Sequence, residues 1–349
     1  MRGEKLDIQS IVADAELRHV LQEELCRFFG RRLEIVKLDR RISQYCSSFI
    51  IEELDVTLDG GMTLQLVFKD LSKAALLTGA EKFKPAFLFN SLREIETYRK
   101  VLSQHQLGTA ECFGAFVDTD TRRYWLFLER MQPVLLWQMG SIEVWNEVAR
   151  WLAGIHTYLV RETEIRESRH LAHLLNYDGK FYSRWIDRAV RFIHEGDTTP
   201  GRKATASIKW LAKRYDRVIE RMLSLPVTVI HGEFFASNIL LDVEPEHFRI
   251  CPVDWEMAAV APGYVDLAGL TSGSWTRPQK DEMARAYYEA LPDDSPARCG
   301  LKEFLANLEC ARLYQAIQWL GWAPGWAPPP EHAQDWLKEA LRCARHLGL

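Results

Sequence analysis

The spacing of hydrophobic residues changes along the chain, and this change predicts two parts of different architecture. Over residues 8–29 apolar side chains recur at helical spacing and stop at Gly30, which predicts an opening helix. Between residues 33 and 131 the period shortens to two, which is typical of strands. The predicted strands cover 33–38, 49–57, 62–69, 111–117 and 124–131. A glycine-containing turn at 58–61 joins the second and third strands as a hairpin.

One helix interrupts the predicted strands. Ser91 and Glu94 stand three residues apart, the arrangement of a capping box at a helix start. An apolar stripe at helical spacing follows, formed by Leu92, Ile95, Tyr98 and Leu102. The first part of the chain is therefore predicted to be a mostly antiparallel sheet with one inserted helix.

From residue 132 onward most of the chain has a helical period. The predicted helices cover 144–160, 181–194, 204–223, 279–291, 301–320 and 331–347. A chain of 349 residues is too long for one typical compact domain. We therefore expect an α+β protein with two lobes, residues 1–131 and residues 132–349, and a cleft between them that binds a small ligand.

The helical pattern of the second part is interrupted at residues 230–256. Two short apolar runs, 239–241 and 248–253, flank a polar stretch and predict an antiparallel hairpin. Asn238 precedes the first strand and Asp254 follows the second, so the pairing brings both to one end, on strands about 4.8 Å apart. Amide and carboxylate oxygens are ligands that Mg²⁺ prefers, commonly together with substrate phosphates. The hairpin therefore predicts a magnesium and phosphate site.

Composition narrows the possible classes of protein. With 47% hydrophobic and 26% charged residues, the chain is expected to be soluble and globular. A net charge of -4 gives no reason to expect nucleic acid or an anionic membrane as partner. The N-terminus lacks the apolar core of a signal peptide, and no apolar run approaches membrane-spanning length. The seven scattered cysteines contain no CxxC pair, which favours reduced thiols in the cytoplasm over disulfides or zinc.

The motifs of the second part resemble those of the aminoglycoside phosphotransferase and choline kinase-like family. HGE-x4-N-x-L from His231, VDWE up to Glu256 and GYVDLA up to Ala268 are similar to the family motifs HGD-x4-N-x-L, IDWE and D-L-A. The resemblance extends to the order of the lobes and implies a protein kinase-like bilobal fold. It also implies a Mg²⁺-dependent kinase that transfers the γ-phosphate of ATP, or of GTP in its place, to a hydroxyl of a small molecule.

The resemblance implies a role for each motif residue. Glu233 stands where the family has its catalytic aspartate, and Asn238 and Asp254 stand where it has its magnesium ligands. Asp266 corresponds to a buried carboxylate that supports the catalytic loop. We interpret His231 as a hydrogen-bonded turn histidine rather than a general base.

Matches in the first part are looser. Lys69, at the end of the third strand, resembles the lysine that reaches the nucleotide's phosphates. Glu94 resembles the helix glutamate that pairs with it. The alternatives are a solvated charge for Lys69 and a capping residue for Glu94.

Two further segments are expected to contact the nucleotide. Residues 127–131, with Glu129 and Met131, resemble the strand that leads into the adenine-binding hinge. Ser47 and Ser48 lie in the loop that covers the phosphates in the family, and they can donate hydroxyl and amide hydrogens. This loop contains no glycine, which makes a close approach of the backbone to phosphate harder.

Glu233 is the main departure from the family pattern. Glutamate is one methylene longer than aspartate, and a misplacement of about 1 Å at a reacting group can cost about a hundredfold in rate. This substitution and the loop without glycine motivate an alternative, a catalytically weak or inactive nucleotide-binding homologue with a regulatory or scaffold role. A third hypothesis, a kinase that acts on protein or lipid, has no sequence feature in its favour.

Candidate acceptor contacts lie on or just after the predicted helix 301–320. Glu309 and Arg312 are polar candidates, and the aromatic faces of Trp319 and Trp322 could stack on a ring-containing acceptor. The alternative is that the tryptophans pack the C-terminal helices together. The acceptor itself stays open among an aminoglycoside, choline, a sugar, an amino-acid derivative and a natural-product intermediate.

Overall fold

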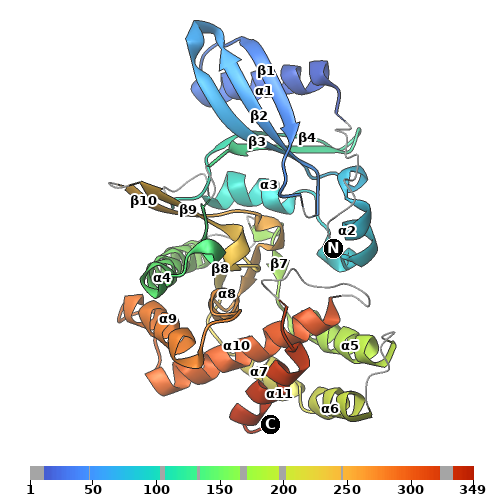
Figure 1. Cartoon of the computed structure of the whole chain (residues 1–349), viewed down its shortest axis with the longest axis vertical. Helices are drawn as coiled ribbons and strands as arrows, with labels where there is room; N and C mark the ends of the chain where they lie inside the picture. The colour runs from blue at the N-terminus through green and yellow to red at the C-terminus, as the bar shows by residue number, and fades with distance from the viewer. Residues whose placement is uncertain are drawn as a thin grey trace. The chain divides into compact units, whose positions relative to one another are not determined.

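A computed structural model shows an α+β chain with an antiparallel sheet and many helices, as the sequence predicts (Figure 1). It describes residues 12–46, 48–102, 107–131, 134–165, 171–195, 202–244, 247–322 and 333–349. The chain divides into two compact units. The first unit comprises Met1–Lys82 and Phe89–Pro133, and the second comprises Phe83–Leu88 and Val134–Leu349.

Five strands form the sheet of the first unit, in the order β1-β2-β3-β5-β4, and every neighbouring pair is antiparallel. The strands are β1 (Ile35–Ile42), β2 (Ile51–Leu58), β3 (Thr63–Asp70), β4 (Cys112–Asp118) and β5 (Arg123–Glu129). Burial alternates residue by residue along β2, and three of its four buried side chains, Leu54, Val56 and Leu58, are apolar. The period of two in the sequence therefore located all five strands.

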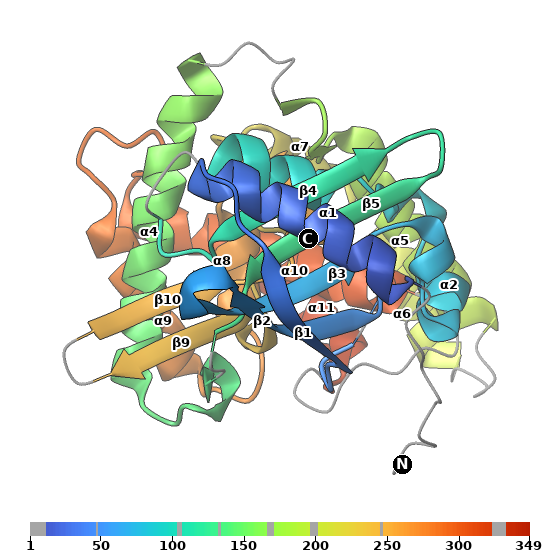
Figure 2. The same ribbon diagram turned by 90° about the horizontal axis from the view of Figure 1, so that it is seen from above.

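Helix α1 (Asp14–Phe29) packs on one face of this sheet (Figure 2). Leu17 and Leu21 are fully buried in a cluster that also contains Phe68 of β3. The helix ends at Gly30, whose left-handed backbone (φ 63°) explains why the helical pattern stops there. Because side chains alternate along a strand, the residue after Phe68 points to the opposite face.

The connection from β3 to β4 contains two short helices, α2 (Thr78–Phe83) and α3 (Arg93–Thr97). The predicted capping box at Ser91 is wrong. The residue before α3 is Leu92, and within the described residues no side chain caps the helix there. The carboxylate of Glu94, which a capping box would use, is instead bound to a lysine of β3.

The second unit is mainly helical. Its described helices of at least seven residues are α4 (Ile142–Ile165), α5 (Gly179–Glu195), α6 (Arg202–Ala212), α7 (Asp216–Leu223), α8 (Tyr264–Leu270), α9 (Arg277–Ala290), α10 (Leu301–Gly321) and α11 (Trp336–His346). Helix α10 contacts α5, α7, α8 and α11, which makes it the centre of the unit (Figure 1). The single helix predicted over 204–223 is in fact α6 and α7, with the buried Tyr215 at the break.

Two small sheets complete the second unit. The predicted hairpin is present as β9 (Ile239–Glu244) and β10 (His247–Pro252), with β6 (Val134–Leu135) beside β9. The other sheet has the order β7-β11-β8, and it consists of β7 (Leu175–Asn176), β11 (Ala259–Ala261) and β8 (Thr228–Ile230). None of the helices that the structure describes has the length and apolar character needed to span a bilayer.

Candidate functional site

Asp266 of α8 holds the loop that follows β8. Its Oδ2 accepts a hydrogen bond from the amide of His231 (2.7 Å), and its Oδ1 accepts one from the amide of Gly232 (2.9 Å). The ring Nε2 of His156 in α4 lies 3.3 Å from Oδ2. Asp266 is 1% exposed, and a buried carboxylate is tolerated only when donors surround it. These bonds therefore fix the backbone of the loop.

Gly232 is required by the shape of this loop. Its φ is 85°, and a Cβ at this position would lie 2.3 Å from the carbonyl oxygen of Met257. Any side chain would therefore push apart the loop and the turn at Trp255–Met257. The glycine keeps the loop against the segment that carries Asp254.

Both ring nitrogens of His231 hold backbone groups of the site. Nε2 is 2.9 Å from the carbonyl oxygen of Val253, and Nδ1 accepts a hydrogen bond of 3.3 Å from the amide of Glu233. A neutral imidazole that is protonated on Nε2 satisfies both contacts. The side chain thus joins the loop to the end of the hairpin.

The hairpin brings Asn238 and Asp254 to its open end. Ile239 pairs with Pro252, and the amide of Val253 donates to the carbonyl oxygen of Asn238 (2.9 Å). The side-chain amide of Asn238 donates to the carbonyl oxygen of Glu233 (3.1 Å), which ties the three segments together.

Asp254 has a left-handed backbone (φ 68°, ψ 60°). This conformation is uncommon outside glycine and costs free energy, and residues held in it cluster at functional sites. Asp254 is therefore a candidate functional residue on its backbone geometry as well as on its side chain.

Carboxylates outnumber cations around Glu233. Burial, together with the negative charges of Glu256 and Asp254, raises the pKa of Glu233 to about 8, against a lowering by Lys84. Lys84 forms an ion pair with Glu256, and both side chains are largely buried. Two carboxylates with one ammonium, beside a carboxyl group whose pKa is raised, form an environment that favours binding of a cation.

The same oxygens fit a magnesium ion. Among the described residues no group of three or more His, Cys, Asp and Glu side chains forms a complete metal cage. Mg²⁺ does not need one, because it is usually bound by one or two carboxylates together with water and substrate phosphates. Asn238 and Asp254 supply the oxygen types that this coordination uses.

No sequence motif points to Lys84. It lies in the polar stretch EKFKP, where a lysine is normally a solvated charge. The structure assigns the segment Phe83–Leu88 to the second unit, where Phe87 lies against the rings of Phe181 and Trp185 of α5. This packing places Lys84 near Glu256.

In the first unit, Lys69 and Glu94 form a two-pronged ion pair. The Nζ of Lys69 lies 2.7 Å from Oε1 and 2.8 Å from Oε2 of Glu94. The residues are 4% and 1% exposed, so Lys69 is not a solvated charge and Glu94 is not a capping residue. The lysine points to α3 because it follows the α1-facing Phe68 on β3.

The loop between β1 and β2 is held by sulfur and backbone contacts. The Sγ of Cys46 accepts a hydrogen bond from the amide of Ile51 (3.2 Å), and the carbonyl oxygen of Ser48 accepts one from the amide of Leu77 (3.0 Å). Ser47 lies outside the described residues. The described contacts hold the ends of the loop without a glycine.

The two residues expected at the hinge lie at the end of β5. The Oε2 of Glu129 accepts a hydrogen bond from the amide of Glu111 (3.0 Å), which fastens the start of β4. Met131 is 9% exposed. The Glu129 carboxylate thus has a structural contact in the first unit.

Of the candidate acceptor residues, Arg312 alone lines the described cavity of the second unit. Glu309 is 3% exposed and contacts the guanidinium groups of Arg277 (3.1 Å), Arg312 (3.3 Å) and Arg342 (2.6 Å). It is therefore the centre of a buried ionic network and not an exposed substrate contact.

The two tryptophans are used in packing. The ring of Trp319 lies 5.3 Å from that of Phe235 and 5.3 Å from that of Trp336. Trp322 stacks on Trp185 at 5.8 Å. These contacts agree with the packing alternative for Trp322. Trp319 links the loop after β8 to α11.

Three comparisons place this geometry among known proteins. The sequence profile of the Phosphotransferase enzyme family matches residues 80–301. No curated protein matches in sequence. Among solved structures, the chain is similar to a microcompartment-associated aminopropanol kinase, with 16% identity, a TM-score of 0.56, and coverage of 89% of this chain and 93% of that one.

Two further structures show the same fold. Choline kinase LicA from Streptococcus pneumoniae has 13% identity and a TM-score of 0.55, over 95% of this chain and 99% of that one. The GDP complex of wild-type aminoglycoside 2'-phosphotransferase-IIIa has 11% identity and a TM-score of 0.52, over 94% and 97%. At these identities the likeness shows the fold, which confirms the expected protein kinase-like architecture. The profile match covers more than half of the sequence, and the chain belongs to the Phosphotransferase enzyme family.

Proposed function

We propose that this protein is a small-molecule kinase that transfers the γ-phosphate of ATP, or of GTP in its place, to a hydroxyl group. Family membership supports a phosphotransferase, and the names of the similar structures describe kinases of small molecules. The observation that carries the proposal is the arrangement at the hairpin. A loop fixed by Asp266 holds Glu233 next to Asn238 at the open end that carries Asp254.

In the proposed reaction Glu233 binds the acceptor hydroxyl and takes its proton. The hydroxyl oxygen forms a bond to the γ-phosphorus while the bond from that phosphorus to the bridging oxygen breaks and the nucleoside diphosphate leaves. Asn238 and Asp254 would hold Mg²⁺, which when bound neutralises charge on the phosphates. Asp266 and His231 are positioning residues, because they fix the loop and do not touch the reacting atoms.

The first unit would supply the nucleotide contacts. Lys69 would place its ammonium on the phosphates, and Glu94 would hold that ammonium in position through its two-pronged contact. Ser47 and Ser48 would cover the phosphates, and the chain at Glu129 and Met131 would contact the adenine. In this proposal residues 1–131 are the nucleotide-binding lobe and residues 132–349 carry the catalytic loop and the acceptor pocket.

We also propose a cytoplasmic setting. All seven cysteines lie within the described residues, and none of them is paired in a disulfide. A reducing compartment that contains ATP fits both the thiols and the proposed donor.

The test is phosphoryl transfer by wild-type protein and two variants of Glu233. Cell extract incubated with the protein, ATP and Mg²⁺ should yield, by mass spectrometry, a species heavier by one phosphate. Glu233→Gln should lower turnover about a thousandfold, since it removes the proton acceptor but keeps the size of the side chain. Affinity for ATP should stay within about threefold. Equal turnover by wild type and Glu233→Gln would remove Glu233 from the chemistry.

Glu233→Asp separates active from inactive alternatives. Because the loop positions a glutamate, the shorter side chain should lower turnover about tenfold to a hundredfold. The alternative is a nucleotide-binding homologue that has lost activity through the same residue. That alternative would hold if Mg²⁺ and ATP stabilise the wild type against heat, no acceptor gains phosphate, and Glu233→Asp restores transfer.

A further inference from the structure

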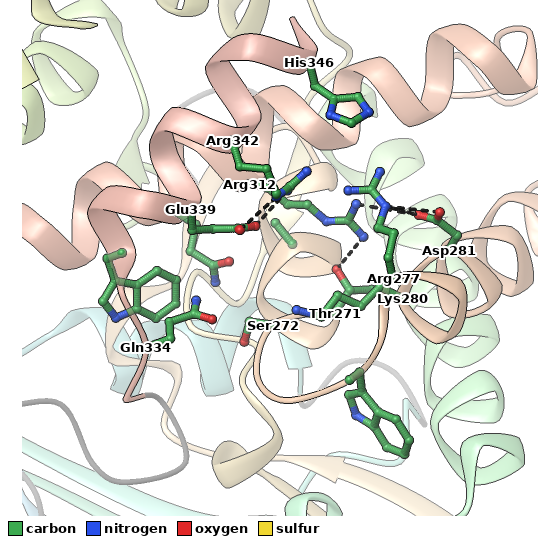
Figure 3. Close-up of a pocket in the computed structure, with 14 residues that line it drawn as sticks. Thr271, Ser272, Arg277, Lys280, Asp281, Arg312, Gln334, Glu339, Arg342 and His346 are labelled. Carbon is green, nitrogen blue, oxygen red and sulfur yellow. Dashed lines mark hydrogen bonds and ion pairs between the residues drawn. The ribbon is translucent and has the colours of Figure 1, made fainter. Parts of the chain in front are cut away.

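The second unit contains a cavity of about 430 Å³ between α8, α9, α10 and α11 (Figure 3). Its volume is in the range typical of small-molecule sites. Neither the metal-binding residues proposed above nor Glu233 are among its lining residues. The cavity is therefore a separate pocket, and its chemistry can be considered by itself.

Positive charge dominates the lining. Its four cationic side chains are Arg277, Lys280, Arg312 and Arg342. Two carboxylates also line the cavity, Asp281 and Glu339, and His346 stands at its edge. With the buried Glu309 included, three carboxylates face four cations in the part of the chain that the structure describes, so the cations there exceed the carboxylates by one.

Among the four lining cations, Lys280 is the one that forms no ion pair with a carboxylate of the described residues. Within the described residues its ammonium donates to the carbonyl oxygen of Gly273 (2.9 Å) and forms no ion pair. Burial, together with the positive charges of Arg312, Arg342 and Arg277, lowers the pKa of Lys280, against a raising by Glu339. Burial and the neighbouring guanidinium groups thus both disfavour the charged ammonium, and an anion bound beside it would stabilise that charge.

Arg312 adds a buried donor. It is 5% exposed, and it donates to Oε2 of Glu309 (3.3 Å). It also donates to Oγ1 of Thr271 (3.2 Å) (Figure 3). Its Nε–H has no acceptor among the described residues. A buried donor without an acceptor is costly, so an anionic oxygen that reached it would be stabilised.

Two indoles form apolar walls of the cavity, and each is held by another ring. Trp336 stacks on Trp319 at 5.3 Å, and Trp275 packs against Trp145 at 5.2 Å. Walls fixed in this way lose little conformational freedom when a ligand binds. They favour a ligand with a ring or another flat apolar part.

Two elements connect the cavity to the loop that carries Glu233. Helix α8 carries Asp266, which binds the loop amides, and its C-terminal end supplies Ala268 and Thr271 to the cavity. Trp319 contacts both Phe235, two residues after Glu233, and the cavity residue Trp336. The cavity and the loop are therefore connected through α8 and through the ring contacts of Trp319.

We propose that this cavity binds an anionic group, a carboxylate or a phosphate, on a ring-containing acceptor. The assignment to the acceptor rests on the proposed kinase function. An acceptor with a permanent positive charge, such as choline, would be repelled by the excess cation. The cavity thus sets the charge class of the substrate.

The direct test is calorimetric titration without nucleotide, using phenyl phosphate, benzoate and benzylammonium as probes. At least one anion should bind and benzylammonium should not, and the stronger anion identifies phosphate or carboxylate. Lys280→Met should weaken the anion about tenfold or more, since one charge-assisted contact is lost while the Glu309 network stays intact. Lys338→Met, an exposed lysine of α11 outside the cavity, is the matched control and should change nothing.

Other outcomes overturn the proposal. These are no binding of either anion at millimolar concentration, equal binding of benzylammonium, or anion binding that Lys280→Met leaves unchanged. Lys280-dependent anion binding without phosphoryl transfer to any acceptor would contradict the kinase function but support the anion site. Transfer only to amine-bearing acceptors would support the kinase function and contradict the anion site.

Discussion

Two charged regions of the second unit have opposite composition. Around Glu233, the carboxylates Asp254 and Glu256 face the single ammonium of Lys84. In the α8–α11 cavity, arginines and a lysine outnumber the carboxylates. Among the described residues, acidic groups outnumber basic ones in the first region, and basic groups outnumber acidic ones in the second.

This difference in charge suits the two regions to two different ligands. A negative excess attracts a divalent cation, which in turn attracts nucleotide phosphates. A positive excess attracts an anionic group of a second ligand. A kinase needs two substrates in one reaction, and opposite charges at two sites of one unit would keep them from exchanging places. Variants that change one region and spare the other can therefore test the separation.

The largest effect is expected for Asp254→Asn. Asparagine tolerates the left-handed backbone at φ 68°, so the variant changes charge without adding strain. Loss of the carboxylate should lower turnover about ten thousandfold, since a metal supplies several kcal/mol of charge stabilisation. Nucleotide binding should also lose its dependence on Mg²⁺, measured by titration with and without the metal. Asp242→Asn, in β9 of the same hairpin, is the matched control.

Anion binding in the cavity should be unchanged by Asp254→Asn. If the variant weakens phenyl phosphate as much as it weakens ATP, the two regions are not independent. If turnover falls less than tenfold, Asp254 does not hold the metal.

A smaller effect is expected for Glu309→Gln, which acts on stability. Burial raises the pKa of Glu309. The positive charges of Arg312, Arg342 and Arg277 have a larger effect, and together they lower the pKa from its usual 4.5 to about 2. A lowered folded-state pKa contributes stability that is present above 4.5 and is lost as pH falls towards 2. The variant should lose about 3 kcal/mol of unfolding free energy at neutral pH.

Urea unfolding between pH 7 and pH 2 checks this prediction. The difference between wild type and Glu309→Gln should shrink as the pH falls, because both side chains are then neutral. Glu303→Gln, an exposed glutamate of α10, should behave as wild type throughout. A difference that does not depend on pH would mean that the network is held by packing rather than by charge.

The acidic region was largely predictable from the sequence. A polar stretch lies between two apolar runs, residues 239–241 and 248–253, and this pattern predicts a hairpin. The pairing of the two strands brings Asn238 near the segment of Asp254. The helix stop at Gly30 and the period-two strands were predictable for the same reason, since they depend on neighbours along the chain. The roles of these residues in a reaction stay predictions.

The basic region was not predictable. The sequence names Arg312 as a candidate acceptor contact, but Lys280 looks like an ordinary helix charge. Only the packing of α9, α10 and α11 brings the two to one cavity. The prediction of a capping box at Ser91 was wrong for a similar reason, because Lys69 of β3 binds the carboxylate of Glu94. Local patterns do not reveal partners that tertiary structure supplies.

The smallest effect is expected for Lys84→Met, which changes the charge of the region around Glu233. The ion pair of Lys84 with Glu256 competes with a bound metal for negative charge. Lys84→Met keeps an apolar stem of similar length, so the packing of Phe83–Leu88 on α5 should survive. The half-saturating Mg²⁺ concentration should fall about tenfold, because Glu256 then lacks its ion pair with Lys84 and attracts the metal ion more strongly. Lys82 is exposed, and the control variant Lys82→Met should leave the half-saturating Mg²⁺ concentration unchanged. A rise in that concentration would show that Lys84 holds Glu256 in place for the metal instead of competing with it.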